Sequence, residues 1–150
     1  MNPLVKNQKA SYDYEILERF EAGLELFGHE VKSIKTGRVT LEGSRVIIRG
    51  GEAYLVGAQI RPYQPKNLPP NYSPDRTIKL LLTKKEIKYL AGAGERQGLT
   101  IIPLAIYNKN SRLKLELALA RGKKKYDKRE IIKKREADRQ IERTLKRQRG

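Results

Sequence analysis

The sequence contains no cysteine and only one histidine, His29. Without cysteine the chain forms no disulfide bonds and performs no thiol chemistry. A single histidine leaves too few nitrogen and sulfur ligands for a transition-metal site. A catalytic triad with histidine as its general base would also have to include His29, and no serine or aspartate stands out as its partner. These absences predict a protein that is not an enzyme and has no metal or cofactor.

Phosphate-loop, membrane and export segments are absent as well. The segment Gly92-Ala93-Gly94 lacks the lysine and the serine or threonine that complete a P-loop. No apolar run approaches the roughly 20 residues of a transmembrane helix. Residues 1–10 are polar and lack the apolar centre of a signal peptide. We therefore expect a cytoplasmic protein that does not bind membranes.

Positive charge is what the sequence has in excess. It contains 33 Lys and Arg against 17 Asp and Glu, which gives a net charge of +16. Residues 121–150 hold 14 of the basic and 5 of the acidic residues, and therefore +9 of that total. Such a charge indicates a polyanionic partner, with nucleic acid as the first choice. The chain divides into a body, residues 1–120, and a basic tail, residues 121–150.

The tail has a helix start signal but few apolar residues that could stabilise a helix by packing. Asp127 and Glu130 resemble a capping box, which predicts a helix from about Lys128. We expect the tail to be mobile or partly helical until a partner orders it, because its apolar stripe is thin. Tyr126 lies among cations and could stack on a base. The alternatives are a solvated tail that aids solubility and a helix on anionic lipid, which the scarcity of bulky apolar residues disfavours. The stripe consists of Ala137, Ile141 and Leu145.

The body reads as a succession of β segments. Residues 12–26, 45–49, 53–60, 78–82, 99–107 and 113–119 are apolar or alternate between apolar and polar. In the first of them Tyr14, Ile16, Phe20 and Leu24 are expected to share one face. Gly50-Gly51 predicts a hairpin turn.

Two helices are predicted between these strands, and two segments without regular structure. A short helix over residues 30–37 ends at Gly37, and a longer one starts at the capping box of Thr83 and Glu86 and runs to about Gln97. Residues 1–11 form a loose leader, and residues 61–76 form a proline-rich loop. About six antiparallel strands with two or three helices predict a mainly β fold, a closed Greek-key barrel of the OB type.

Four segments in this order resemble the small protein B family, the tmRNA-binding (SsrA-binding) proteins of bacteria. The resemblance extends from about residue 7 to residue 146. It rests on residues 14–23, the motif Gly28-His29-Glu30-Val31-Lys32-Ser33-Ile34, residues 75–82, and the motif Gly122-Lys123-Lys124-Lys125-Tyr126-Asp127-Lys128-Arg129.

This resemblance implies a function in ribosome rescue. The OB-type body would bind the tRNA-like part of tmRNA, as a monomer on its RNA. The tail would occupy the empty decoding site and the mRNA channel of a stalled ribosome and fold there as a helix. Translation would resume on tmRNA, the nascent chain would be tagged for degradation, and the ribosome would be released.

The resemblance also carries over residues that contact RNA. Lys114 could bind phosphate and Tyr14 could stack on a base. Glu21 could accept from base or 2′-OH donors, position a neighbouring cation, or only pair with a cation at the surface. Leu81 could contact RNA or lie in the core, as residues of apolar runs usually do. The expected tmRNA contacts are thus Tyr14, Glu21, Leu81 and Lys114.

The tail motif corresponds to the family's decoding-centre segment. Its expected residues are Gly122, Lys123, Lys124, Tyr126, Asp127, Lys128 and Arg129. Many family members have histidine where this chain has Tyr126, and tyrosine does not become cationic near neutral pH. The alternative function is that of a general ribosomal or single-stranded-RNA-binding OB protein, whose tail is only an electrostatic anchor.

Overall fold

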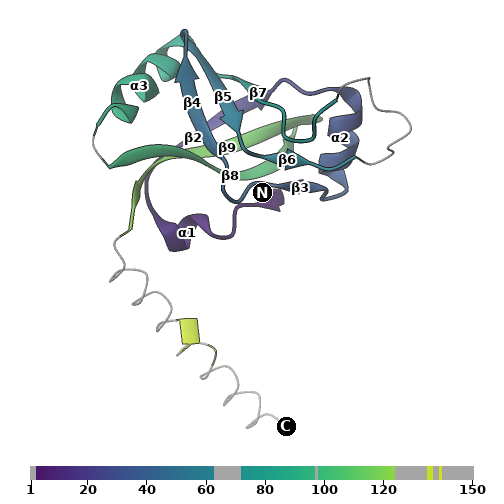
Figure 1. Ribbon diagram of the computed structural model, residues 1–150, viewed down its shortest axis with the longest axis horizontal. Helices are drawn as coiled ribbons and strands as arrows, with labels where there is room; N and C mark the ends of the chain where they lie inside the picture. Colours follow the sequence, from purple (N-terminus) through teal and green to yellow (C-terminus); the bar gives the residue numbers. More distant parts are fainter. Residues whose placement is uncertain (1–2, 63–71, 97, 124–134, 137–138, 140–150) are drawn as a thin grey trace.

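The computed structural model describes residues 3–62, 72–96, 98–123, 135–136 and 139, and the structural statements below refer to these residues. Figure 1 shows a curved sheet with α3 at one end and α2 at the other. The elements in chain order are β1 (Pro3–Lys6), α1 (Ala10–Asp13), β2 (Tyr14–Leu24), α2 (Gly28–Lys35), β3 (Val39–Thr40), β4 (Arg45–Arg49), β5 (Glu52–Val56), β6 (Gln59–Ile60), β7 (Ile78–Leu81), α3 (Lys84–Gly94), β8 (Leu99–Lys109) and β9 (Arg112–Gly122).

Seven of the strands form one antiparallel sheet in the order β1-β8-β9-β2-β7-β5-β4, and β3 pairs with β6. The sheet curls until β4 approaches β8, although no ladder joins these two strands within the described ranges. The predicted mainly β, OB-type fold is confirmed. The strands outnumber the six predicted because β1 and β3 were not expected and the predicted strand over 53–60 is divided into β5 and β6.

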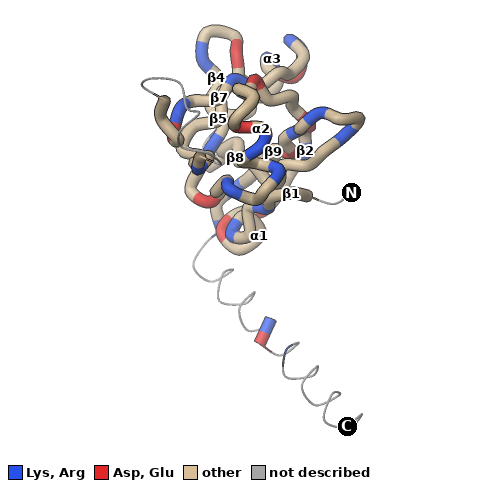
Figure 2. Tube along the Cα trace, turned by 90° about the vertical axis from the view of Figure 1, so that its right-hand side faces the viewer, with Lys and Arg blue, Asp and Glu red and all other residues tan. Residues whose placement is uncertain are grey.

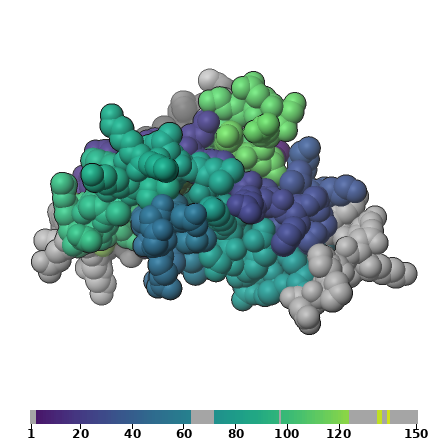
Figure 3. All heavy atoms as spheres, turned by 90° about the horizontal axis from the view of Figure 1, so that it is seen from above, coloured from purple at the N-terminus to yellow at the C-terminus, as the bar shows by residue number. Residues whose placement is uncertain are grey.

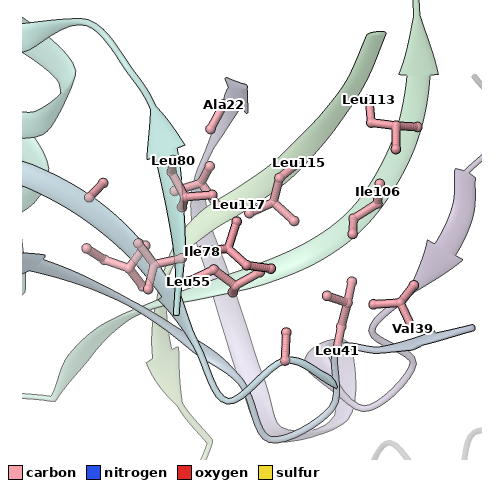
Figure 4. Close-up of a cluster of buried hydrophobic side chains, with 14 of the residues drawn as sticks. Ala22, Val39, Leu41, Leu55, Ile78, Leu80, Ile106, Leu113, Leu115 and Leu117 are labelled. Carbon is pink, nitrogen blue, oxygen red and sulfur yellow. The ribbon is translucent and has the colours of Figure 1, made fainter. Parts of the chain in front are cut away.

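The core lies inside the curve of the sheet (Figure 4). One face of β9 supplies Leu113, Leu115, Leu117 and Leu119, which are all buried, as their alternation predicts. Each such side chain contributes about 1.5–3 kcal/mol on burial. The same alternation turns Lys114 and Glu116 to the outer face of the sheet.

Residues 3–11 were predicted to belong to a loose leader, but the structure orders them. Residues 3–6 are β1, which pairs with β8, and Val5 packs against the core. Residues 10–13 are α1, whose Ala10 is buried with Ile102 and Ala120 in a second, smaller cluster. The prediction of a loose leader failed because the pairing that orders it involves a strand about one hundred residues away.

A β-bulge in β2 makes a second prediction wrong, namely that four apolar residues of this strand share one face. The register with β9 shifts between Ile16 and Glu18, so Leu17 is an extra residue in the ladder. Ile16 therefore packs in the small cluster, whereas Phe20 packs against the main core. The four apolar residues of this strand do not share one face. Beyond the bulge the odd-numbered residues, Glu21 among them, point to the same side as Tyr14 and Ile16.

The predicted turns and helix ends are mostly confirmed. Gly37 has φ +76°, and Gly50 and Gly51 have φ +61° and +75° as their hairpin requires. Helix α2 begins two residues earlier than predicted, and α3 ends at Gly94, three residues before Gln97. The predicted strand over 53–60 is interrupted by Gly57, whose φ is +89°. None of the helices in the described ranges is long and apolar enough to span a membrane.

Candidate nucleic-acid interface

Three of the four expected RNA contacts meet on the outer face of the sheet. Gly23 of β2 pairs with Leu81 of β7 on one side and with Lys114 of β9 on the other. Glu21 precedes Gly23 on the same face, because alternate residues of a strand point the same way. We call the set Glu21, Leu81, Lys109, Arg112 and Lys114 the outer patch.

Leu81 is exposed, with 54% of its surface accessible. It lies across Gly23, where an added Cβ would stand 3.1 Å from the Leu81 Cβ. The interpretation of Leu81 as a core residue is therefore wrong. Its neighbour Leu80 is buried instead, because successive residues of β7 face opposite sides of the sheet.

Glu21 is tied to two neighbours from β8. The hydroxyl of Tyr107 donates to Glu21 Oε2, and Lys109 Nζ lies 3.2 Å from the same oxygen and 3.3 Å from Oε1. The bonds from Tyr107 and Lys109 lower the pKa of the Glu21 carboxyl, so it stays charged. Burial and the bond to Glu21 raise the pKa of Tyr107, so its hydroxyl stays protonated and donates.

A groove of about 270 Å³ adjoins the outer patch. Its apolar lining includes Leu26 and Val31, and its cations are Lys35, Arg112 and Lys114. Figure 3 shows the green atoms of the β8–β9 hairpin beside the purple-blue atoms of α2. A groove that combines apolar lining with cations offers contacts for both a base and a phosphate.

Tyr14, the fourth expected contact, lies apart from the outer patch. It starts β2 and pairs with Gly122 at the far end of β9. The next residue, Lys123, donates its backbone N–H to Asp13 O (2.9 Å) and its Nζ to Ser11 O (2.6 Å). Tyr14 therefore lies where the tail leaves the body.

Most of the expected decoding-centre residues lie outside the described part of the chain. Lys124, Tyr126, Asp127, Lys128 and Arg129 are among them. Within residues 121–150 the structure also describes Arg121 and Gly122, which end β9, Lys123, and the helical positions Arg135, Glu136 and Arg139.

A buried ion pair joins two of the segments that resemble the small protein B family. Glu30 has a fully buried side chain, and Arg76 Nη2 lies 2.6 Å from its Oε1. The Phe27 N–H and the Tyr72 hydroxyl also donate to this carboxylate, each at 2.8 Å. Burial alone would raise the pKa of Glu30, but the bonds from Arg76, Phe27 and Tyr72 outweigh it and lower the pKa. The pair fixes α2 against the start of β7.

His29 has an aromatic environment rather than a ligand-like one. Its ring is stacked with Phe27 at 5.8 Å and meets Tyr72 edge-on at 4.6 Å. Within the described residues, no group of three or more His, Cys, Asp or Glu is arranged to hold a metal ion.

The sequence did not point to Tyr107, Lys109, Arg112 or the pairing of Glu30 with Arg76 as parts of a site. Alternation along β8 and β9 places Tyr107, Lys109 and Arg112 on one face only when the register between these strands is known. No local pattern joins Glu30 to Arg76, which follows it by 46 residues.

The fold and this surface define a small OB-type β protein with cations gathered on the outer face of its sheet. The family profile described as SmpB protein matches residues 4–147. The chain belongs to the SmpB family.

Relatives and a solved structure agree with this assignment. An SsrA-binding protein of Gloeothece citriformis is 47% identical over 144 residues, which are 96% of this chain and 93% of the relative. An SsrA-binding protein of Roseiflexus castenholzii is 51% identical over 140 residues, which are 93% and 89% of the two chains. A structure described as "tmRNA-SmpB: a journey to the center of the bacterial ribosome" matches with a TM-score of 0.68 and 43% identity, covering 87% of this chain and 95% of the other.

Proposed function

We propose that this protein binds the tRNA-like part of tmRNA through its body and brings tmRNA to stalled ribosomes. Membership of the SmpB family, over residues 4–147, is the observation that carries the proposal, since the relatives are SsrA-binding proteins. The outer patch supports it because lysine and arginine bind phosphates while an exposed leucine offers an apolar contact to a base. The protein acts by binding and has no catalytic step of its own.

The tail acts in the ribosome. Its net charge of +9 over residues 121–150 suits an RNA-lined channel. It occupies the empty decoding site and the mRNA channel, so that translation continues on tmRNA, the nascent chain is tagged for degradation and the ribosome is released. The decoding-centre segment starts where Gly122 and Lys123 leave the body, and the residues that enter the decoding centre are Lys124, Tyr126, Asp127, Lys128 and Arg129.

A truncation after Lys123 tests this division of labour. The cut keeps the whole of β9 and the contacts of Lys123 with Asp13 and Ser11. We expect the truncated protein to retain affinity for the tRNA-like part of tmRNA and to lose tagging on stalled ribosomes in a purified translation system. The full chain serves as the control in both assays.

The opposite result would identify a general RNA-binding protein. If the truncation weakens binding to all RNAs alike and flattens the salt dependence, the tail is an electrostatic anchor. If the full chain itself binds the tRNA-like part no more tightly than an unrelated RNA of equal length, the proposed function is wrong.

A further inference from the structure

The turn between β8 and β9 gathers cations on the outer face of the sheet. Lys109 pairs with Arg112 across the hairpin, and Tyr107 pairs with Lys114. Paired residues of an antiparallel ladder share a face, and their Cβ atoms lie about 4.5–5.5 Å apart. Lys109 and Arg112 are exposed, and Figure 2 shows Lys and Arg segments beside β9 and β2.

The acidic residues on this face leave the cluster positive. Glu116, which pairs with Glu21 across β2 and β9, forms an ion pair with Arg19 at 2.7 Å. Glu21 forms an ion pair with Lys109, whose Nζ lies 3.2 Å from Glu21 Oε2. Among the described residues, no carboxylate forms an ion pair with Arg112 or Lys114. Two of the three cations at the hairpin end are therefore not neutralised by a salt bridge.

The geometry of Glu21 restricts what it can do for RNA. The Tyr107 hydroxyl donates to its carboxylate, and Tyr107 is itself buried, with only 2% of the residue exposed. The carboxylate in turn holds Lys109, whose ammonium has three N–H donors. A phosphate approaching this surface would be repelled by Glu21 and attracted by the ammonium that Glu21 fixes in place.

We propose that the end of the β8–β9 hairpin is a phosphate-binding site for RNA, in which Lys109 and Arg112 bind phosphates beside Lys114 and Glu21 is a positioning residue that acts through Lys109. This inference rests on the proposed RNA-binding function and adds to it the residues that hold the backbone. It also gives a reason for a carboxylate at an RNA-binding surface. Glu21 reduces the freedom of a long flexible cation before the RNA arrives, and thereby lowers the entropy cost of binding.

The experiment measures the affinity of the full chain for the tRNA-like part of tmRNA between 0.05 and 0.5 M salt, at about five concentrations. The variants are Lys109→Met, Arg112→Met, Glu21→Gln and the double variant Glu21→Gln/Lys109→Met, with Lys109→Arg as the conservative replacement. Lys88→Met is the matched control, because it removes the same charge from the exposed face of α3, at the other end of the molecule (Figure 1). Thermal unfolding of each variant verifies that it folds.

Each loss of a phosphate contact should lower the salt slope by about 0.7–0.9 and weaken binding about five- to eightfold at 0.1 M salt. We expect this for Lys109→Met and for Arg112→Met, and neither change for Lys88→Met. Lys109→Arg should retain most of the affinity. Glu21→Gln should also weaken binding, although by no more than Lys109→Met does, and the double variant should bind no more weakly than Lys109→Met alone.

Three results would count against the inference while leaving the proposed function intact. Unchanged affinity and slope in Lys109→Met and Arg112→Met would exclude the phosphate site. Multiplicative losses in the double variant, or an unaltered affinity of Glu21→Gln, would exclude the positioning role. Failure of the proposed function would look different, because the unmodified chain itself would then not prefer the tRNA-like RNA over an unrelated RNA of equal length.

Discussion

Asn110 and Ser111 form the two-residue turn that joins β8 to β9, and both have positive φ angles, +51° and +65°. This is the φ pattern of a type I′ turn, whose twist suits the two long strands that it joins. Asparagine tolerates the left-handed region, but serine does so only at a cost of about 1–2 kcal/mol. The turn sets the cross-strand positions of Lys109 and Arg112, the two cations of the proposed phosphate site.

Replacing Ser111 by glycine should therefore stabilise the protein. Glycine adopts positive φ without steric strain, and the gain should exceed its entropy cost in the unfolded chain, so we expect about 0.5–1 kcal/mol. Urea unfolding at pH 7 measures the change. Ser111→Ala is the control, since alanine removes the hydroxyl but keeps the strain. Equal stability of the two variants would mean that the backbone at Ser111 is not strained.

At the scale of elements, α2 is attached to β7 by the ion pair between Glu30 and Arg76 rather than by a long apolar face. The Arg76 guanidinium also lies 4.5 Å from the centre of the Phe27 ring and donates to the carbonyl of Glu25. These contacts gather the end of β2, the start of α2 and the start of β7 at one corner. The groove beside the outer patch depends on the same corner, because α2 supplies Val31 and Lys35 to it.

Arg76→Met should destabilise the fold by about 3 kcal/mol, because it leaves the fully buried carboxylate of Glu30 without its cation. Lys79→Met is the matched control: it removes the cation of the exposed pair with Glu52, and should leave the stability nearly unchanged. Denaturant unfolding of the two variants at pH 7 makes the comparison. Equal effects would show that the corner is not held by this ion pair.

The same ion pair predicts how stability depends on pH. The pKa of Glu30 is lowered in the folded protein from its ordinary value of 4.5. Its contribution is therefore fully present above about pH 4.5 and is lost as the pH falls through the folded-state pKa. Glu30→Gln should be less stable at pH 7 and should lose less stability between pH 5 and 3 than the unmodified protein. Parallel curves for the two proteins would contradict this assignment.

On the scale of the whole molecule, the body and the tail meet where β9 ends. The last strand runs to Gly122, and Lys123 is bonded to the carbonyls of Asp13 and Ser11. The sequence placed the boundary after residue 120, where the charge run begins. The hydrogen bonds of the body extend three residues further, so the first cations of the run belong to the folded part of the chain.

Two truncations should therefore differ in stability. A chain that ends at Lys123 should unfold with nearly the free energy of the full chain. A chain that ends at Ala120 loses the end of the β2–β9 ladder and both contacts of Lys123, and should be less stable by about 1–3 kcal/mol. Thermal and urea unfolding measure both. If the shorter chain proves as stable as the longer one, the contacts of Lys123 do not hold the end of the body.

Features that depend on neighbouring residues were predictable from the sequence. The alternation of leucines in β9, the capping box at Thr83 and Glu86, the glycine turns and the charge of the tail each have a local physical cause, and each was predictable. The likeness of several short segments to one family was readable in the same way, and the match of the SmpB profile confirmed it.

Which side chains meet depends on the three-dimensional packing of the strands. Tyr14 and Glu21 differ by an odd number of residues and would lie on opposite faces of a regular strand, but the bulge at Leu17 turns them to the same side. Glu21 meets Tyr107 and Lys109, and Glu30 meets Arg76, across 46 to 88 residues of chain. Register and bulges depend on the packing of distant strands against one core, which no local pattern encodes.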